Sequence, residues 1–175
     1  MRFDNQNGLD AKDIVNTYSE RELIRIFTDF GEEPLARNIA KEICKIRSID
    51  EITGSVLADI CKRTYAIKFK KKSTTHPATR VWQALRIEVN QEFENIRNFV
   101  PQALELLESG GRLGIITFHS IEDALVKRLF KSFAQAPPPD LNSPLPEEFI
   151  PTANLITKKS IKPTEEEVKE NPRSR

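Results

Sequence analysis

This 175-residue sequence has few cysteines, no long apolar run and almost no net charge, and each of these features excludes a class of protein. The two cysteines, Cys44 and Cys61, have no CxxC partner and lie among apolar residues at helical spacing, which favours buried free thiols over a disulfide or a metal site. No run approaches membrane-spanning length and the start has no apolar signal segment, so we expect a cytoplasmic protein without a membrane partner. The net charge of +1 means that any contact with nucleic acid must come from a local patch.

Residues 10–64 predict a series of short helices. Ser19 and Glu22 have the spacing of a capping box, Gly31 supplies a stop, Pro34 suits the start of a second helix, and Thr53 suits the cap of a third. The apolar residues at helical spacing are Leu23, Ile26, Phe27 and Phe30, then Leu35, Ile39, Ile43 and Ile46, then Val56, Leu57 and Ile60. Such stripes indicate helices that pack against one another around a core.

A basic segment follows, from residue 62 to residue 75, and it contains no acidic residue. Its cations are Lys62, Arg63, Lys68, Lys70, Lys71 and Lys72. Tyr65 and Phe69 are interleaved with them. Two interpretations stay open, because such a segment can neutralise phosphates and stack on unpaired bases, or it can be a solvated loop without function.

From His76 the pattern becomes strongly helical again. Residues 76–99 predict one long helix with Pro77 in its first turn, and Pro101 predicts the start of a second helix that ends at residues 110–111. The buried stripe of the long helix is expected to contain Val81, Ala84, Leu85, Val89, Phe93 and Ile96. Residues 113–118 form a short continuous apolar run between glycines and a helix start, which is typical of a buried parallel strand.

The remaining segments predict an α/β layered unit. A helix over residues 121–133 follows the strand, and Ser120 and Asp123 have the types and spacing of a cap. Residues 136–151 are rich in proline and predict a surface connection, while residues 154–159 predict a second, weaker strand. Thr164 suits the cap of a short acidic helix. One strand cannot form a sheet, so the partners of residues 113–118 must lie elsewhere.

His119 follows directly after the predicted strand. In open α/β sheets, ligands bind beyond the carboxyl ends of the strands, so an imidazole at this position is a candidate site residue. Ser120 and Asp123 are fully explained as a cap, and the alternative for His119 is an ordinary turn residue. We see no constellation of metal ligands in the sequence and expect no metal.

Several blocks of this sequence resemble one family in the same order. They are MRFD (1–4), GEE (31–33), HPATRVWQALRIEVN (76–90), GGRLGIITFHSIEDALVKRLF (110–130) and the segment 167–173. They are similar to the bacterial 16S rRNA (cytosine-N4)-methyltransferase family, known as MraW or RsmH. The two long blocks are specific, since neither is a general fold motif, whereas the proline-rich residues 136–160 do not carry the resemblance.

The resemblance implies a Rossmann-like methyltransferase that uses S-adenosyl-L-methionine and methylates a cytosine in the decoding region of small-subunit ribosomal RNA. Residues 1–8 would be a remnant of the preceding segment, 9–75 an inserted helical substrate-recognition domain, and 76–175 the C-terminal part of the methyltransferase domain. The family's Gly-rich cofactor loop, acidic ribose-binding residue and DLG-type turn precede the block at residues 1–4, and this sequence has none of them. We therefore expect a mostly helical C-terminal fragment that retains no cofactor-binding residue and does not bind the methyl donor alone.

Within the resemblance, catalysis would rest on positioning an unstacked cytosine amine for direct methyl transfer. His119 is the candidate catalytic residue. The candidates for RNA contact are His76, Arg80, Arg86, Asn90, Lys70, Lys71 and Lys72. Helical spacing would place His76 with Arg80, and Arg86 with Asn90, on shared faces. The alternative is a non-catalytic RNA-binding or protein-interaction module.

Overall fold

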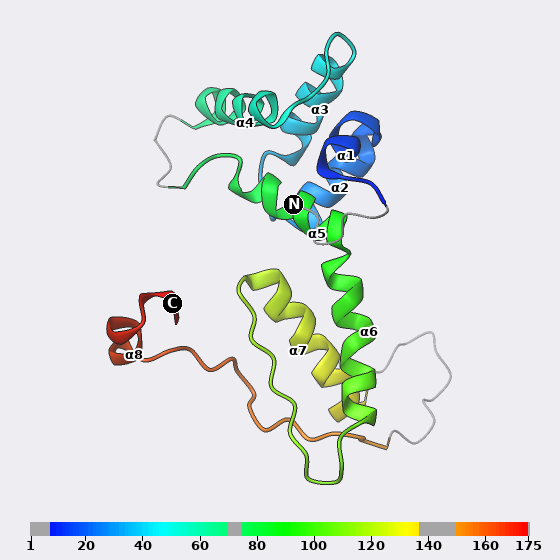
Figure 1. Cartoon of the computed structure of the whole chain (residues 1–175), viewed down its shortest axis with the longest axis vertical. Helices are drawn as coiled ribbons and strands as arrows, with labels where there is room; N and C mark the ends of the chain where they lie inside the picture. The colour runs from blue at the N-terminus through cyan, green and yellow to red at the C-terminus, as the bar shows by residue number, and fades with distance from the viewer. Residues whose placement is uncertain (1–7, 70–74, 137–149, 175) are drawn as a thin grey trace. The chain divides into compact units, whose positions relative to one another are not determined.

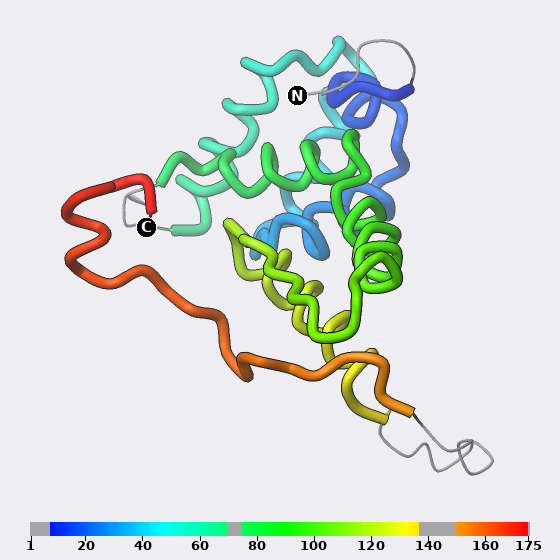
Figure 2. Tube along the Cα trace, turned by 60° about the horizontal axis from the view of Figure 1, so that its bottom comes forward, coloured from blue at the N-terminus to red at the C-terminus, as the bar shows by residue number. Residues whose placement is uncertain are grey.

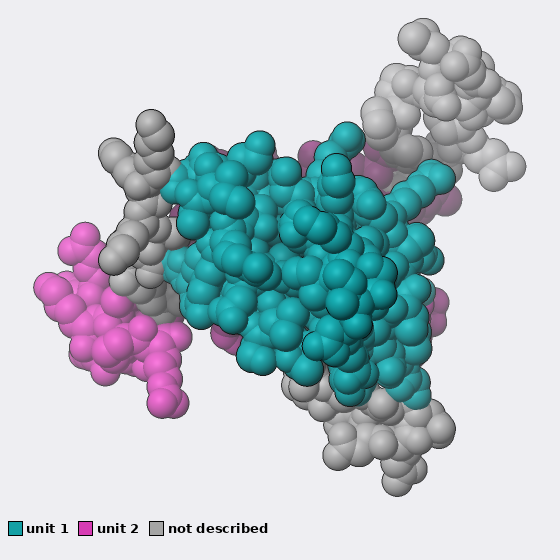
Figure 3. All heavy atoms as spheres, turned by 90° about the horizontal axis from the view of Figure 1, so that it is seen from above, with its two compact units in different colours: residues 1–95 teal, residues 96–175 magenta. Residues whose placement is uncertain are grey.

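The computed structural model describes residues 8–69, 75–136 and 150–174 of the chain. Every regular element among them is a helix, as Figure 1 shows, and the trace in Figure 2 follows the chain through these helices. The chain divides into two compact units, residues 1–95 and residues 96–175 (Figure 3), and each is described by itself. None of the helices in the described ranges combines the length and the apolar content that crossing a membrane requires.

The first unit contains five helices that the sequence largely predicts. They are α1 (Ala11–Thr17), α2 (Glu20–Asp29), α3 (Ala36–Arg47), α4 (Gly54–Lys68) and α5 (Thr79–Asn90). The predicted capping box of Ser19 and Glu22 is present at the start of α2, and the Thr53 hydroxyl accepts from the Val56 amide at the start of α4. A second capping box, formed by Asp10 and Asp13 at the start of α1, was not predicted.

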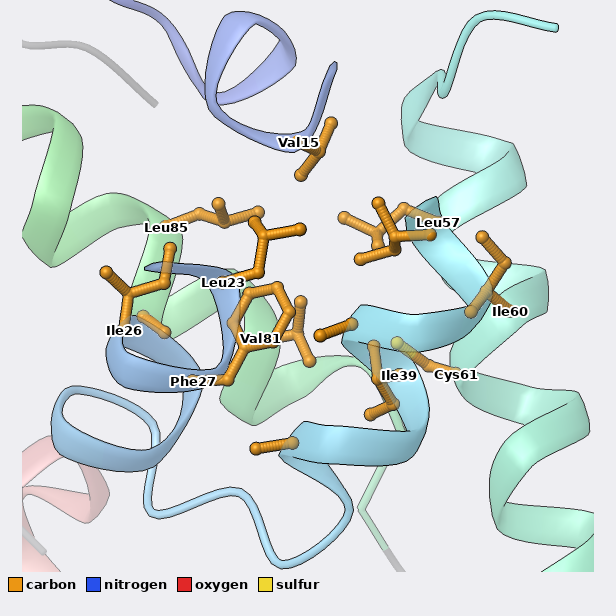
Figure 4. Packing of buried hydrophobic residues seen from close by; sticks show 14 of the residues in the cluster. Val15, Leu23, Ile26, Phe27, Ile39, Leu57, Ile60, Cys61, Val81 and Leu85 are labelled. Carbon is orange, nitrogen blue, oxygen red and sulfur yellow. The ribbon is translucent and has the colours of Figure 1, made fainter. Parts of the chain in front are cut away.

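A hydrophobic core fills the first unit. Both α1 and α2 contact α3 and α5, and α4 packs on α3. Figure 4 shows the side chains that meet there, among them Leu23, Ile26 and Phe27 from α2, Ile39 from α3, Leu57, Ile60 and Cys61 from α4, and Val81 and Leu85 from α5. Full burial of such a side chain contributes about 1.5–3 kcal/mol, so the predicted apolar stripes stabilise this unit.

Gly31 has a different role from the predicted helix stop. Helix α2 ends at Asp29, and the left-handed backbone after it belongs to Glu32, with φ 47°. A Cβ added to Gly31 would lie 2.7 Å from the carbonyl oxygen of Arg80 and 2.8 Å from that of Phe27. The glycine is therefore needed because the end of α2 approaches the backbone of α5 closely.

The long helix predicted over residues 76–99 is wrong, because it breaks at Gln91. Gln91 adopts a left-handed conformation with φ 50° and ψ 37°, and α6 (Glu92–Glu105) begins directly after it. Across the break, the Arg86 guanidinium donates to both carboxylate oxygens of Glu92, at 2.8 and 3.0 Å. The prediction for Pro101 is also wrong, since this proline lies inside α6 rather than at a helix start.

The second unit contains the rest of α6, followed by α7 (Ser120–Ala134), α8 (Glu165–Glu170) and the 3₁₀ turn η1 (Pro172–Ser174). Helix α7 confirms the helix predicted over residues 121–133, and the Thr164 hydroxyl caps α8 as predicted. The strands predicted over residues 113–118 and 154–159 are not formed, and the described residues contain no strand. The physical reason is that a strand requires a hydrogen-bonded neighbour, which the described part of the chain does not supply.

Residues 113–118 nevertheless keep the alternation of a strand. Leu113, Ile115 and Thr117 are half-buried, whereas Ile116 and Phe118 are 82% and 86% exposed. Such a period of two is what an extended segment shows when one of its faces is covered. The Rossmann-like sheet implied by the resemblance stays a prediction.

Candidate functional site

His119 is the residue that begins helix α7. Its backbone is extended, with φ −147° and ψ 162°, and its Nδ1 accepts from the amide of Glu122 at 3.2 Å. The Glu122 carboxylate in turn accepts from the amide of Phe118 at 2.7 Å. The expected cap of Ser120 and Asp123 is therefore wrong by one residue: Ser120 is the first residue of the helix, and the Asp123 carboxylate pairs with Lys127.

This cap fixes the orientation of the His119 ring. Because Nδ1 accepts a hydrogen bond, the proton of the neutral imidazole is assigned to Nε2. The ring is half-buried and follows the strand-like residues 113–118 directly. Histidine is not among the usual N-cap residues, which is why sequence reasoning gave the cap to Ser120. A catalytic role for His119 stays a proposal.

Arg80 and His76 do not share a helical face. His76 is exposed and lies before α5, where its Nδ1 accepts from the amide of Ala78 at 3.2 Å. Arg80 is in the first turn of α5, and its guanidinium donates to the carbonyl oxygen of Glu32 at 2.8 Å. The helical-spacing argument for this pair is wrong because Pro77 and Ala78 form a turn before the helix.

Arg86 and Asn90 do share a face of α5, as their spacing predicted. The Asn90 side-chain amide donates to the carbonyl oxygen of Arg86 at 2.8 Å. The Arg86 guanidinium is 43% exposed and is held by Glu92, itself 18% exposed. The side chains of Arg86 and Asn90 thus stabilise the break at Gln91. Any contact with RNA would use the part of the Arg86 guanidinium that stays exposed.

The basic segment is only partly a loop. Lys70, Lys71 and Lys72 lie outside the described residues, whereas residues 62–68 belong to α4. Lys62 pairs with Asp59 at 3.3 Å. The Phe69 ring is 47% exposed and its centroid lies 5.4 Å from that of Tyr65. The Tyr65 hydroxyl is bound within the unit, and base stacking by these rings stays a prediction.

Glu33 is the partner that holds Tyr65, and sequence reasoning missed it. Its carboxylate is buried, with the residue 3% exposed, and accepts from the Tyr65 hydroxyl at 2.8 and 2.9 Å and from the Leu35 amide at 2.9 Å. Burial, and then the bond to Glu33, raises the pKa of the Tyr65 hydroxyl. Burial, with a smaller effect of the same carboxylate, raises the pKa of the Cys61 thiol to about 12. The cluster is a structural tie between α4 and the loop before α3.

Comparison with known proteins identifies the family of this chain. A model of the MraW methylase family matches residues 1–175. The chain belongs to the MraW methylase family. It is 44% identical over 178 residues to the ribosomal RNA small subunit methyltransferase H of Spiroplasma kunkelii, a match that covers 100% of this chain and 56% of that protein. It is 41% identical over 181 residues to the protein of the same name from Desulforapulum autotrophicum, covering 100% of this chain and 57% of that protein.

The chain therefore spans a little more than half the length of these relatives. The expectation that this chain alone does not bind the methyl donor stays a prediction. No group of three or more histidine, cysteine or acidic residues suited to a metal occurs in the described ranges.

Proposed function

We propose that this chain acts as the C-terminal part of an enzyme that transfers a methyl group from S-adenosyl-L-methionine to the N4 amine of a cytosine in the decoding region of small-subunit ribosomal RNA. One observation carries the proposal: the family match extends over residues 1–175, and the relatives at 44% and 41% identity are named as ribosomal RNA small subunit methyltransferases. Because the chain covers only 56% and 57% of these relatives, we propose that it is inactive alone.

The residues of this chain would bind and position the RNA. The exocyclic amine of cytosine is a poor nucleophile because its lone pair is delocalised into the ring, so its orientation contributes much of the rate. The base must leave its stack to reach an enclosed site. We assign the orientation of the amine to His119, whose ring is fixed by the cap on Glu122, and contact with the flanking RNA to His76, Arg80, Arg86 and Asn90.

A chimera tests the proposal. The N-terminal part of a related enzyme would be joined ahead of residue 1. The assay is incorporation of labelled methyl groups into immature small ribosomal subunits, with the product located by mass spectrometry. We expect a methylated cytosine, and we expect His119→Ala to lower the rate by about a hundredfold, as loss of one positioned group does. A chimera that folds and binds the donor but methylates nothing would contradict the enzymatic proposal.

The isolated chain provides a second test. We expect calorimetry to detect no binding of S-adenosyl-L-methionine, whereas the chimera should bind it. Micromolar binding to the isolated chain would contradict the assignment of the donor site to another segment.

The second candidate function is a non-catalytic RNA-binding or protein-interaction module, which the run of cations in residues 62–72 favours. Replacing Lys70, Lys71 and Lys72 with Ala should reduce the salt dependence of RNA binding by about two to three in the log–log slope if each contacts a phosphate. An unchanged slope would make this segment a solvated loop. RNA binding by the isolated chain together with an inactive chimera would favour the module.

A further inference from the structure

Helix α3 presents a row of three cations to solvent. Arg37, Lys41 and Lys45 are spaced four residues apart, and all three are exposed. At about 1.5 Å of rise per residue, the row is about 12 Å long. The opposite face of the helix is buried in the core through Ala36, Ile39, Ala40 and Ile43. The row is therefore held on a rigid element whose orientation is fixed by packing.

These cations lack the carboxylate partners that others in the unit have. Lys12, Arg25, Lys62 and Arg86 each lie 2.8–3.3 Å from a carboxylate oxygen. Among the described residues, no ion pair or hydrogen bond involves the side chains of Arg37, Lys41 or Lys45. The other exposed residues of α3 and its cap, Asn38 and Ser48, are neutral, and the one acidic residue of the helix, Glu42, is half-buried beside the row.

The dipole of helix α3 does not explain the positions of all three cations. A cation in the last turn is favourable because it faces the negative end of the helix dipole, and Lys45 occupies that turn. Arg37 is in the first turn, where the dipole disfavours a cation, and that turn contains no acidic residue. The position of Arg37 against the dipole is therefore not explained by the stability of the helix itself.

We propose that Arg37, Lys41 and Lys45 form a binding surface for the phosphate backbone of RNA. This inference rests on the proposed function, which supplies an RNA substrate, and it assigns RNA contacts to residues outside the basic segment 62–75. Along one strand of a duplex, phosphates recur about every 3.4 Å, so a row of about 12 Å spans roughly three or four of them. Asn38 on the same face adds a neutral donor of the kind that contacts phosphate and sugar. The row fixes orientation on the RNA and reads no base.

The test is the salt dependence of binding to a fluorescently labelled single-stranded oligouridylate, measured by anisotropy with the whole chain. The variant R37Q/K41Q/K45Q removes the row and keeps good helix formers. Each phosphate contact contributes about 0.7 to the log–log slope for a single strand, so the slope should fall by about two. The matched control is R128Q/K131Q/K158Q, which removes the same charge from exposed, unpaired cations of the second unit and should leave the slope nearly unchanged.

A charge-keeping variant, R37K/K41R/K45R, separates binding from folding. It should retain the slope of the native chain, and circular dichroism should show equal helix content in all variants. Equal slopes for the triple-glutamine variant and the native chain would show that the row does not bind RNA phosphates, although the chain binds RNA elsewhere. A native chain that binds neither oligouridylate nor small ribosomal subunits would overturn the RNA proposal and the row with it. Row-dependent binding to phosphatidylserine vesicles without RNA binding would also overturn the assignment to RNA.

Discussion

The Tyr65 hydroxyl donates to both carboxylate oxygens of Glu33, at 2.8 and 2.9 Å, across 32 positions of sequence. The carboxylate is buried and has no cation within ion-pair distance among the described residues, so the hydroxyl and the Leu35 amide compensate for its loss of hydration. This relationship ties α4 to the loop that leads into α3.

Tyr65→Phe should destabilise the first unit. Removing the hydroxyl leaves a buried carboxylate short of one donor, which typically costs about 1–3 kcal/mol. The free energy of unfolding would be measured by urea denaturation. The control is Tyr18→Phe, because Glu88 keeps its bond from Arg25 after that change and the loss should be smaller. Equal losses in the two variants would contradict the special role of Glu33.

The stability of the first unit should fall above pH 9. In the unfolded chain the Cys61 thiol ionises near its ordinary pKa of 9, whereas burial in the folded unit raises that pKa to about 12. Between these values the unfolded chain releases a proton that the folded chain keeps, so the free energy of unfolding falls by up to about 1.4 kcal/mol per pH unit. Denaturation at several pH values checks this, and Cys61→Ala should flatten the decline. Thiol-labelling kinetics should show Cys44 reacting before Cys61.

Gly31→Ala should be destabilising by about 1–3 kcal/mol, because the new methyl group would lie 2.7 Å from the Arg80 carbonyl and the backbones must separate. Gly54→Ala is the matched control. There the added methyl would meet Trp82 at 3.6 Å, an ordinary contact, and alanine favours the first turn of α4. Thermal unfolding of both variants compares them directly, and similar melting temperatures would contradict the close approach of α2 and α5.

The cap and the proposed catalytic role of His119 can be separated. His119→Asn keeps a side-chain acceptor for the Glu122 amide and removes the imidazole, whereas His119→Ala removes both. Loss of a cap costs about 0.5–2 kcal/mol, so only the alanine variant should lower the stability of the second unit. In the chimera, both variants should lose methylation. Activity retained by His119→Asn would assign the histidine to capping alone.

The exposed apolar residues of segment 113–118 should promote self-association of the isolated chain. An extended segment that pairs with no strand among the described residues and exposes Ile116 and Phe118 is a template for pairing with another chain. Ile116→Glu/Phe118→Glu should reduce self-association in analytical ultracentrifugation. Ile67→Glu, at a helical position that is 82% exposed, should have little effect. A native chain that stays monomeric at high concentration would contradict this prediction.

Local signals explain which parts of the fold were predictable. The Ser19 box, the Thr53 cap and the apolar stripes depend on neighbours within a few residues, and the structure confirms them. The break at Gln91 depends on a non-glycine residue in a left-handed conformation, which is uncommon and which the helical pattern of the sequence does not reveal. The pairing of Arg86 with Glu92, six positions apart, spans this break. The predicted strands show the same limit, because residues 113–118 have the alternation of a strand but no partner strand among the described residues.

The candidate site was predictable only in part. His119 was singled out by its place after an apolar run, whereas its capping bond to Glu122 depends on an uncommon cap residue. Glu33 was missed because nothing in the sequence distinguishes a buried glutamate from a solvated one until Tyr65 is seen beside it. Arg80 was chosen from its motif, and its bond to the Glu32 carbonyl follows from the approach of α2 to α5.

The core of the first unit is drawn entirely from residues 14–85, with partly buried residues as late as Val89 packed against it. Domains generally fold as units during synthesis, from the N-terminal side. The residues of this core therefore leave the ribosome before residues 113–118 do, and the helical unit can close first. Residues 113–118 then emerge when the core side chains of the first unit are already buried and are no longer available as wrong partners.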